Sequence, residues 1–308
     1  MAKVRVIMMQ RDEGDNLARW LTHYGNLFDF PNLEIMDNGS VDPMTIDLLK
    51  EAEKAGVRIY WGYDTLNDFH NKGGHFGNIV KSWDNTFDYD FALPLDCDEI
   101  LAAVTDNGLS TDKADIHRTL NQLKGLSQSC RMDMLMFNVP GRPGWFAPDR
   151  AFHKGFLPAR TMEIIDNGQH DPQSKTPGYV SVPLTYLHWH NASFEETQQR
   201  ARRKMEPRAA DLTDREALLA YKQTPNAPGV HLIDLLLMEP AEYYNKYADE
   251  VTFYAPSHGG RTVLHARGQY RLWDSAAYLA ANPDVQGYEL GPFHHYLRFG
   301  YAEGRALS

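Results

Sequence analysis

The sequence predicts an α/β protein whose sheet is mostly parallel and covered by helices. In the first 95 residues, short apolar runs alternate with segments whose apolar residues recur at helical spacing, in the order strand, helix, strand, helix, strand. Of the 308 residues, 43% are hydrophobic and 23% are charged, which is ordinary for a folded globular protein. The length allows one large domain or a main domain with a small appendage.

The elements of the first part follow one another closely. The apolar run 4–9 predicts a strand, and Asp15 is the candidate N-cap of the helix after it. Apolar side chains of that helix recur at helical spacing: Leu17, Trp20, Leu21, Tyr24 and Leu27. The further elements expected are a strand at 33–37, a helix at 44–56, a strand at 57–62, a glycine-containing loop at 67–76, a helix at 77–87 and a strand at 91–95.

The pattern beyond residue 105 is less regular. It predicts a helix at 113–125, a strand at 131–139, a loop at 140–155, a strand at 180–190, a helix at 193–205 that begins with a capping box, an interrupted helical stretch at 206–250 and short helices from 273 to the end. We therefore expect a main domain at 1–205, a helical or irregular extension packed on it at 206–267, and a short helical module at 268–308.

Charge and cysteine content exclude several classes of protein. The formal net charge is −10, which disfavours nucleic acid as a partner, because phosphate binding needs clustered Lys and Arg. Only Cys97 and Cys130 occur, so we expect no disulfide framework and a reducing, cytoplasmic location. No segment reaches the roughly 20 apolar residues of a membrane span, although work at the inner face of a membrane remains compatible with the sequence.

An acidic cluster follows the fourth predicted strand. In "LPLDCDEIL" (93–101), Asp96, Asp98 and Glu99 come directly after apolar residues. Ligands of open α/β sheets bind beyond the carboxyl ends of the strands. Two aspartates at such a position can hold one divalent cation, which cancels their repulsion, and Mg²⁺ or Mn²⁺ bound in this way commonly also contacts substrate phosphates. Alone, a D-x-D pair is weak evidence of a metal site, because a solvated turn can have the same sequence.

Three motifs in series carry a resemblance. "RDEGDNLARW", "LEIMDNGSVD" and "FALPLDCDEIL" occur in this order, with strands and helices between them. Over about residues 3–205 the chain resembles family-2-like bacterial glycosyltransferases of the GT-A fold. The resemblance implies a Rossmann-like sheet with flanking helices and an inverting, Mn²⁺- or Mg²⁺-dependent transfer of a sugar. The donor would be a nucleotide-diphosphate sugar, most often a UDP-sugar, and the acceptor a carbohydrate or glycolipid of bacterial surface polysaccharide synthesis.

The resemblance also assigns roles to single residues. It implies nucleotide-sugar contacts for Arg11, Glu13, Asp37, Lys72, Asn78 and Asp96. It implies metal ligation by Asp96, Asp98 and His188. His188 ends a strand in "LHWHNASFEETQQRARRK" and matches the motif histidine of the family, whereas His190 is an additional histidine on the same face. A looser match to the family, "HKGFLPARTMEIIDNGQH", makes Lys154 and His170 candidate site residues.

The catalytic base is not fixed by these motifs. Asp149, Glu163, Asp166 and His170 lie in the relevant stretch, and Asp149 and His170 are the two residues we select as catalytic candidates. The neighbouring Trp145 and Phe146 can stack on an acceptor sugar or anchor a hydrophobic lid.

The C-terminal segment contains "NPDV" and "HYLRFGYAEGR". It resembles a short helical repeat module appended to bacterial glycosyltransferases and surface-polysaccharide proteins. We expect its His294 and His295 to serve packing or to lie on the surface.

Three other functions remain open. A metal-dependent hydrolase could use Asp96, Asp98, His188 and His190. A nucleotidyltransferase shares the fold and the use of metal. An inactive GT-A-like binding protein would keep the fold without the reaction.

Overall fold

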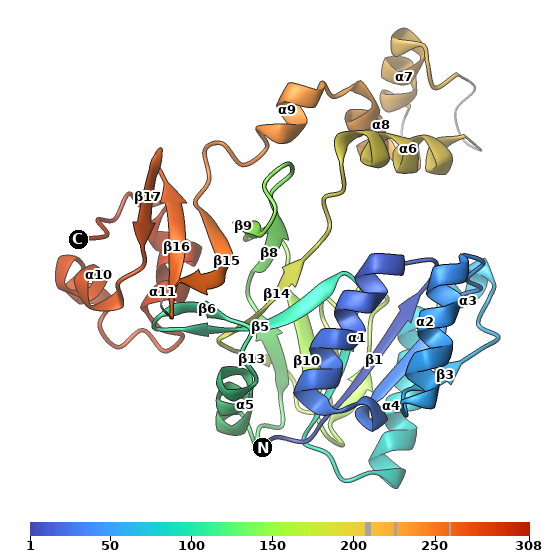
Figure 1. Cartoon of the computed structure of the whole chain (residues 1–308), viewed down its shortest axis with the longest axis horizontal. Helices are drawn as coiled ribbons and strands as arrows, with labels where there is room; N and C mark the ends of the chain where they lie inside the picture. Colours follow the sequence, from blue (N-terminus) through green and yellow to red (C-terminus); the bar gives the residue numbers. More distant parts are fainter. Residues whose placement is uncertain (207–210, 225–226, 259) are drawn as a thin grey trace.

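The chain forms a mixed α/β protein with two large sheets (Figure 1). The structure is a computed structural model and describes residues 1–206, 211–224, 227–258 and 260–308. A third, two-stranded ribbon pairs β11 (Met162–Ile164) with β12 (Gln173–Ser174).

The first sheet has seven strands and contains the predicted parallel unit. In spatial order they are β13 (Tyr179–Ser181), β7 (Ser129–Met132), β10 (Lys154–Pro158), β4 (Phe91–Leu95), β1 (Val4–Gln10), β2 (Leu33–Asp37) and β3 (Arg58–Tyr60). Strands β4, β1, β2 and β3 are mutually parallel, which confirms the prediction for the first four strands. Strand β10 runs antiparallel to both β4 and β7.

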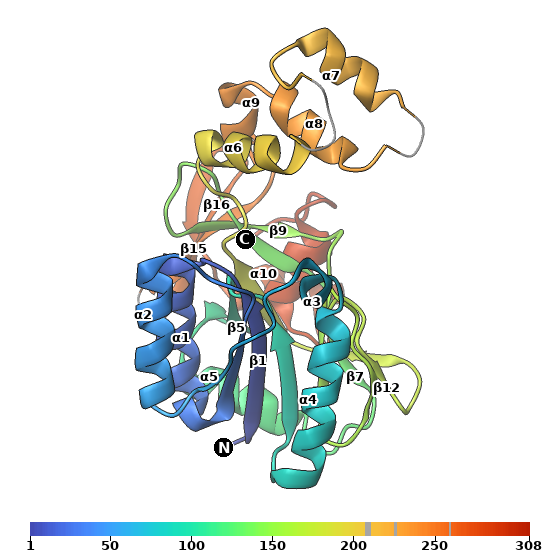
Figure 2. The same ribbon diagram turned by 90° about the vertical axis from the view of Figure 1, so that its right-hand side faces the viewer.

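Strand β1 is buried on both faces and separates two hydrophobic layers. Val6 and Met8 pack in the larger core, and Ile7 and Met9 pack in a second core on the other face. Figure 2 shows α1 and α2 on one side of β1 and α4 on the other. The helices of this half are α1 (Gly14–Phe28), α2 (Pro43–Lys54), α3 (Leu66–His70), α4 (Lys72–Thr86) and α5 (Lys113–Gln122), with a 3₁₀ turn η1 (Phe30–Asn32). All five apolar positions predicted to face the core in α1 are buried, but Asp15 lies in its first turn and is not the N-cap, which is Glu13.

The second sheet has eight strands and is mostly antiparallel, so the prediction of a mostly parallel sheet holds only for the first. Its strands in spatial order are β17 (Gln269–Leu272), β16 (Arg261–Ala266), β15 (Thr252–His258), β9 (Trp145–Asp149), β8 (Leu135–Asn138), β14 (Leu184–His188), β5 (Glu99–Thr105) and β6 (Gly108–Ser110). The pair β14 and β8 is parallel.

Two stretches predicted as single strands each divide between the sheets. The stretch 131–139 ends β7 of the first sheet and then forms β8 of the second, and 180–190 is divided in the same way into β13 and β14. Pro183 lies at the second division, where its missing N–H cannot continue a ladder of hydrogen bonds. Each apolar run thus connects the two sheets.

The C-terminal part is joined to the main core across the expected boundaries at 205 and 267. Strands β15 and β16 replace part of the expected helical or irregular extension, β17 stands at the start of the expected helical module, and β15 pairs with β9. Trp273, Tyr278 and Phe293 are buried in the same core as α1. The last segment contains α10 (Ser275–Ala281), η2 (Pro283–Val285), α11 (Pro292–His295) and a π-helical turn η3 (Tyr296–Gly300). The expected short helices are therefore present.

Four helices form a lobe that projects from the sheets in both views (Figures 1 and 2). They are α6 (Phe194–Met205), α7 (Arg215–Lys222), α8 (Val230–Leu237) and α9 (Pro240–Tyr244). Helices α6 to α8 share a separate small core that includes Met205, Leu218 and Ile233. The lobe agrees with the helical pattern predicted for 206–250, of which residues 207–210 and 225–226 lie outside the described part.

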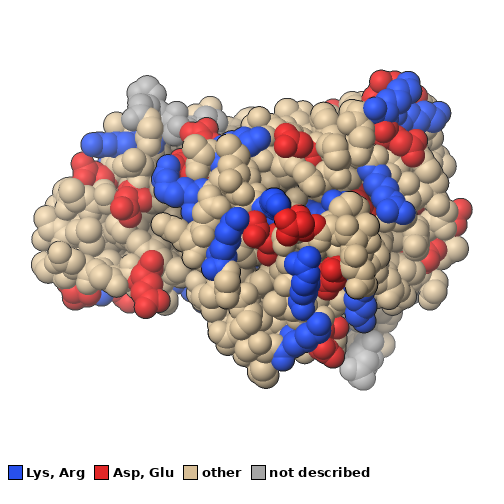
Figure 3. Space-filling view, turned by 90° about the horizontal axis from the view of Figure 1, so that it is seen from below, with Lys and Arg blue, Asp and Glu red and all other residues tan. Residues whose placement is uncertain are grey.

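Surface charge is mixed where it can be seen from below. Figure 3 shows Lys and Arg side chains interspersed with Asp and Glu, so neither sign of charge dominates that face. Within the described ranges, every helix is too short or too polar to cross a membrane.

The two C-terminal histidines are packing residues, as predicted. His294 is 1% exposed and its Nδ1 lies 3.1 Å from the hydroxyl of Tyr288, while His295 Nδ1 lies 2.9 Å from the hydroxyl of Tyr278. Burial lowers the pKa of His294 to about 4. Its ring therefore stays neutral in the folded protein at pH values where it would be protonated in the unfolded chain.

This difference predicts a loss of stability in acid. Because the unfolded chain binds the extra proton, the stabilisation is complete above about pH 6.5 and is lost as the pH falls toward 4. We expect His294→Gln to reduce the loss of unfolding free energy between pH 7 and pH 5 by about 1–2 kcal/mol, measured by urea denaturation. His70→Gln, at an exposed position of α3, is the matched control. An unchanged pH dependence in the His294 variant would contradict the prediction.

Candidate functional site

A cavity of about 630 Å³ opens beyond the carboxyl ends of β1, β4 and β14. It brings together most of the residues that the sequence selected, from segments far apart in the chain. The selected residues that line it are Arg11, Glu13, Lys72, Asp96, Asp98, Lys154, His170, His188 and His190. The position is the one expected for a ligand site of an α/β sheet.

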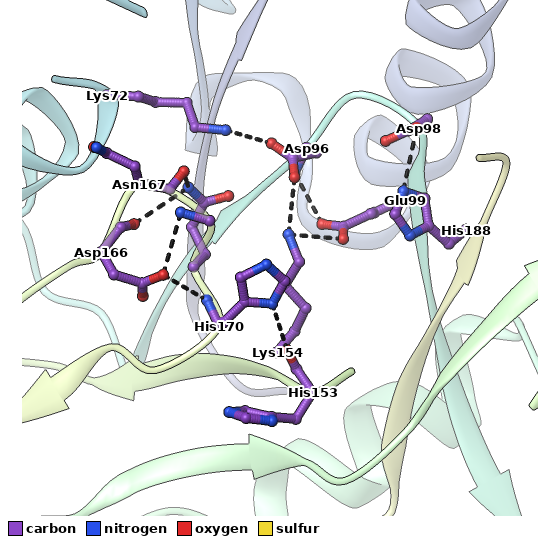
Figure 4. Close-up of polar contacts among 12 residues, drawn as sticks. Lys72, Asp96, Asp98, Glu99, His153, Lys154, Asp166, Asn167, His170 and His188 are labelled. Carbon is purple, nitrogen blue, oxygen red and sulfur yellow. Dashed lines mark hydrogen bonds and ion pairs between the residues drawn. The ribbon is translucent and has the colours of Figure 1, made fainter. Parts of the chain in front are cut away.

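Asp96 lies between two lysines (Figure 4). Lys72 Nζ is 2.6 Å from its Oδ1 and Lys154 Nζ is 2.8 Å from its Oδ2. Burial alone would raise the pKa of Asp96, but the charges of Lys154 and Lys72 outweigh it and hold that pKa well below the usual range. The carboxylate is therefore ionised and already compensated by protein groups.

Lys154 also neutralises a second carboxylate. Its Nζ is 2.9 Å from Glu99 Oε1, and the Glu99 side chain has no exposed surface. Burial raises the pKa of Glu99, although the nearby Lys154 charge acts in the opposite direction. Burial would lower the pKa of Lys154, but the carboxylates of Glu99 and Asp96 outweigh it and raise that pKa. Strand β10 positions Lys154 because it pairs with β4 and β7 in the first sheet.

Asp98 faces a different group of side chains. His188 Nε2 donates to Asp98 Oδ2 over 3.2 Å, and the His188 ring stacks on Phe137 at 4.8 Å. The pairing of β14 with β5 sets His188 opposite Glu99, next to Asp98 in the chain. Burial would raise the pKa of Asp98, but the hydrogen bond and charge of His188 outweigh burial and lower that pKa. In the same way, burial would lower the pKa of His188, but Asp98 outweighs burial and raises it.

Asp98, His188 and His190 form a cluster that can hold a metal ion. One ligand atom from each lies within 4.8 Å of the others. Ligands of a divalent ion with bonds of about 2.0–2.2 Å are separated by about 3–4 Å, so the cluster needs only small adjustments. His188 Nδ1 is buried and has no hydrogen-bond partner in the described part of the chain. Burial and the neighbouring His188 lower the pKa of His190 to about 4, which keeps its ring neutral. Asp98 favours the protonated ring of His188 instead, so binding of a metal ion would have to displace that proton.

The arrangement differs from the sequence prediction at Asp96. We expected Asp96 and Asp98 to reach the same cation, but both Asp96 oxygens contact lysine amines. His190, an additional histidine in the sequence pattern, takes the third place in the cluster instead. The alternation of a strand, which puts His188 and His190 on one face, is the signal that pointed to it.

Two predicted nucleotide-sugar contacts lie outside the cavity. Asp37 organises its own loop, where Oδ1 accepts a hydrogen bond from Gln10 Nε2 at 2.6 Å and Oδ2 accepts one from Ser40 N at 3.0 Å. Its neighbour Asn38 lines the cavity in its place. Asn78 is exposed on α4 and is not among the lining residues.

The expected glycine-containing loop is mostly helical. Residues 67–70 lie in α3, and α4 begins at Lys72, earlier than predicted. The close packing of this helix explains the glycine at position 73, because an added Cβ there would come within 2.3 Å of the Ile165 carbonyl oxygen. Because α4 begins at Lys72, this side chain projects from the end of a helix and not from a loop.

Of the two catalytic candidates, only His170 lines the cavity. Its Nδ1 lies 2.8 Å from the His153 carbonyl oxygen, so Nδ1 carries the proton in a neutral ring and Nε2 is the accepting nitrogen (Figure 4). Asp149 ends β9 away from the cavity and accepts a hydrogen bond from Ala151 N at 2.9 Å. The structure thus places Asp149, which we selected from the sequence as a catalytic candidate, outside the cavity.

Asp166 and Glu163, the other two candidates for the catalytic base, do not line the cavity. Asp166 accepts backbone hydrogen bonds from His170 and Asp171 in a turn, and Glu163 is exposed on β11. Phe146 is fully buried, and Trp145 packs against Tyr254 and Tyr270 on the second sheet. Neither aromatic side chain lines the cavity.

Sequence reasoning missed the role of Glu99 and the aromatic side of the cavity. Glu99 belongs to the quoted acidic cluster, but its pairing with Lys154 depends on contacts between distant strands. Phe137 and Phe152 line the cavity and contact each other with ring centroids 6.1 Å apart. Both lie in or beside segments predicted only as strand or loop, and no sequence signal distinguishes them from core aromatics.

Comparisons with known proteins add little. No protein-family model matches the chain, and no curated protein matches it. The solved structures that resemble it include a mannose-1-phosphate geranyltransferase from Thermus thermophilus, with 10% identity, a TM-score of 0.25, and coverage of 92% of this chain and 79% of that one. A likeness this weak supports no conclusion about function.

Proposed function

We propose that the protein is a metal-dependent glycosyltransferase of the GT-A fold that moves a sugar from a nucleotide-diphosphate donor, with UDP as the first candidate, to a carbohydrate or glycolipid acceptor. The observation that carries the proposal is the three-ligand cluster of Asp98, His188 and His190 inside a cavity that also contains cationic side chains. The series of sequence motifs that resembles family-2-like glycosyltransferases includes the same Asp98 in its third motif.

The donor set suits one of the expected ions better than the other. Asp98, His188 and His190 would hold the metal with one carboxylate and two imidazoles, whereas Mg²⁺ strongly prefers oxygen ligands. We therefore favour Mn²⁺ over Mg²⁺. A bound divalent ion would stabilise the negative charge of the departing diphosphate.

The other side chains of the cavity would bind and orient the donor. Arg11 is exposed at the rim and can contact a phosphate through two N–H groups. Lys72 is held by Asp96 and presents its charge to the same space. Because Lys154 is shared by Asp96 and Glu99, it fixes the position of Asp96 and keeps the floor of the cavity close to neutral.

Nucleotide binding in the presence of metal is the direct test. We expect UDP or GDP to stabilise the protein when Mn²⁺ is present and much less without it, measured by thermal denaturation and calorimetric titration. A nucleotide at 100 times its Kd adds about 2.7 kcal/mol, which raises the Tm by several degrees. Release of UDP or GDP from a panel of nucleotide sugars then tests the reaction. No binding of any nucleoside diphosphate with Mn²⁺ would contradict the proposal.

A hydrolase is the second candidate, because two histidines and one carboxylate also make a typical catalytic zinc site. It predicts Zn²⁺-dependent cleavage of bis-p-nitrophenyl phosphate without any nucleotide. Release of pyrophosphate from UTP or GTP with a sugar 1-phosphate would instead support a nucleotidyltransferase.

A further inference from the structure

A second cleft lies beside the candidate site and shares a wall with it. It has a volume of about 530 Å³, within the range of small-molecule sites. It lies between the start of α1 and the start of α6, and Glu13 lines both this cleft and the cavity that holds Asp98. A reaction between two bound substrates needs two such adjacent spaces.

Glu13 is held at this junction by its place in the fold. It lies three residues after β1 and is the N-cap residue of α1. One carboxylate oxygen accepts a hydrogen bond from Asn16 Nδ2 at 3.0 Å, and Asn16 in turn accepts one from Arg19 at 2.8 Å. Burial raises the pKa of Glu13, which makes its carboxylate a stronger base than an exposed one.

The lining of the second cleft suits a ligand rich in hydroxyl groups. Arg200 and Glu196 project from α6, and Asn191 adds an amide that is fixed by hydrogen bonds to Asn138. The Arg19 guanidinium lies 4.0 Å from the ring centroid of Trp189, so the two side chains together form a wall. Arg200 and Glu196 pair with each other across one turn of α6. The cleft thus offers both donors and acceptors of hydrogen bonds, which matches sugar hydroxyls because each hydroxyl does both.

We propose that this cleft binds the terminal sugar of the acceptor and that Glu13 is the group that removes the proton from its reacting hydroxyl. The inference rests on the proposed glycosyltransferase function and adds the acceptor class and the base. As the acceptor oxygen forms its bond to the anomeric carbon of the donor, the bond from that carbon to the diphosphate oxygen breaks. Its electron pair stays on the diphosphate, and the hydroxyl proton passes to the Glu13 carboxylate.

The role of Glu13 is tested with Glu13→Gln, which keeps the shape of the side chain and removes its basicity. We expect kcat for nucleotide release from the active nucleotide sugar, with water or sugar as acceptor, to fall about 100-fold. The motif resemblance implied a nucleotide-sugar contact for Glu13, and this proposal replaces that role with one on the acceptor. The Kd of UDP or GDP with Mn²⁺ should therefore stay within about twofold, since a base that acts on the acceptor contributes little to nucleotide binding. If kcat is unchanged, if the nucleotide Kd rises as much as kcat falls, or if His170→Gln alone removes turnover, the assignment is overturned.

The cleft itself is tested with a matched pair on α6. Arg200 lines the cleft, whereas Arg203 is exposed on the same helix and does not line it. Methyl glycosides of glucose, galactose, mannose and N-acetylglucosamine serve as acceptor probes. We expect at least one to accelerate nucleotide release by wild type, Arg200→Ala to raise its KM at least about fivefold, and Arg203→Ala to leave it unchanged.

The outcomes separate the two proposals. If no probe accelerates release, or if the two arginine variants behave alike, the cleft is not the acceptor site, although nucleotide and Mn²⁺ binding can still support the glycosyltransferase. If no nucleoside diphosphate binds with Mn²⁺, the proposed function falls and this inference falls with it.

Discussion

Replacing Asp98 with Asn is expected to lower donor turnover about a thousandfold and to abolish the Mn²⁺-dependent part of nucleotide binding. The substitution keeps the size of the side chain but removes the charge that attracts a cation. It also removes the anionic partner of His188, whose pKa Asp98 raises. Calorimetric titration of UDP or GDP with and without Mn²⁺, together with nucleotide-release assays, measures both effects.

Asp149→Asn is the control for the Asp98→Asn variant. The sequence selected Asp149 as a catalytic residue, but the structure puts it outside the cavity, at the end of β9. We expect turnover within about twofold of wild type, because the half-buried side chain lies outside the cavity and its hydrogen bond to Ala151 is local. An Asp98 variant with wild-type turnover, or an Asp149 variant without activity, would show that the cavity described above is not the reaction site.

Lys154→Met is expected to destabilise the protein by about 3–5 kcal/mol. The substitution removes the positive charge of a buried ion pair and leaves the buried Glu99 carboxylate without a counter-charge. Glu99 would lose its ammonium partner while remaining fully buried, whereas Asp96 would keep Lys72. The free energy of unfolding from urea titrations measures the loss.

Two further variants separate charge from packing. Lys154→Met combined with Glu99→Gln should be more stable than Lys154→Met alone, because the unpaired charge is gone. Lys72→Met should cost only about 1 kcal/mol, since Asp96 is 30% exposed and keeps Lys154. In the single Lys154 variant the folded-state pKa of Glu99 lies even further above its unfolded value, so stability should decrease as the pH rises through that range. Equal losses in all three variants would contradict this account.

The parallel unit could be predicted from the sequence because its information is local. Strands β1, β2 and β4 are buried on both faces and appear as short apolar runs, and the amphipathic spacing of Leu17, Trp20 and Tyr24 identifies α1. The carboxyl ends of these strands then locate the site, and with it Arg11 and Asp98.

The second sheet and the partners of Asp96 could not be predicted in this way. The divisions at Asp133 and Pro183 depend on which sheet each half of an apolar run joins, which single-sequence periodicity does not contain. The contact of Lys154 with Asp96 and Glu99 depends on the pairing of β10 with β4 and β7. Strands β15 to β17 are a different case, because β16 alternates in burial and Gly268 separates it from β17, which is a usual hairpin signal that sequence reasoning missed.

The strand order of the second sheet constrains how the chain can fold during synthesis. Strand β9 pairs on one side with β8, close in sequence, and on the other side with β15, which is synthesised much later than β9. Such long-range pairing slows folding and leaves the outer edge of β9 unpaired until the ribosome has synthesised β15. The nascent protein therefore exposes an aggregation-prone edge until β15 has emerged, and we expect chaperones to raise its yield.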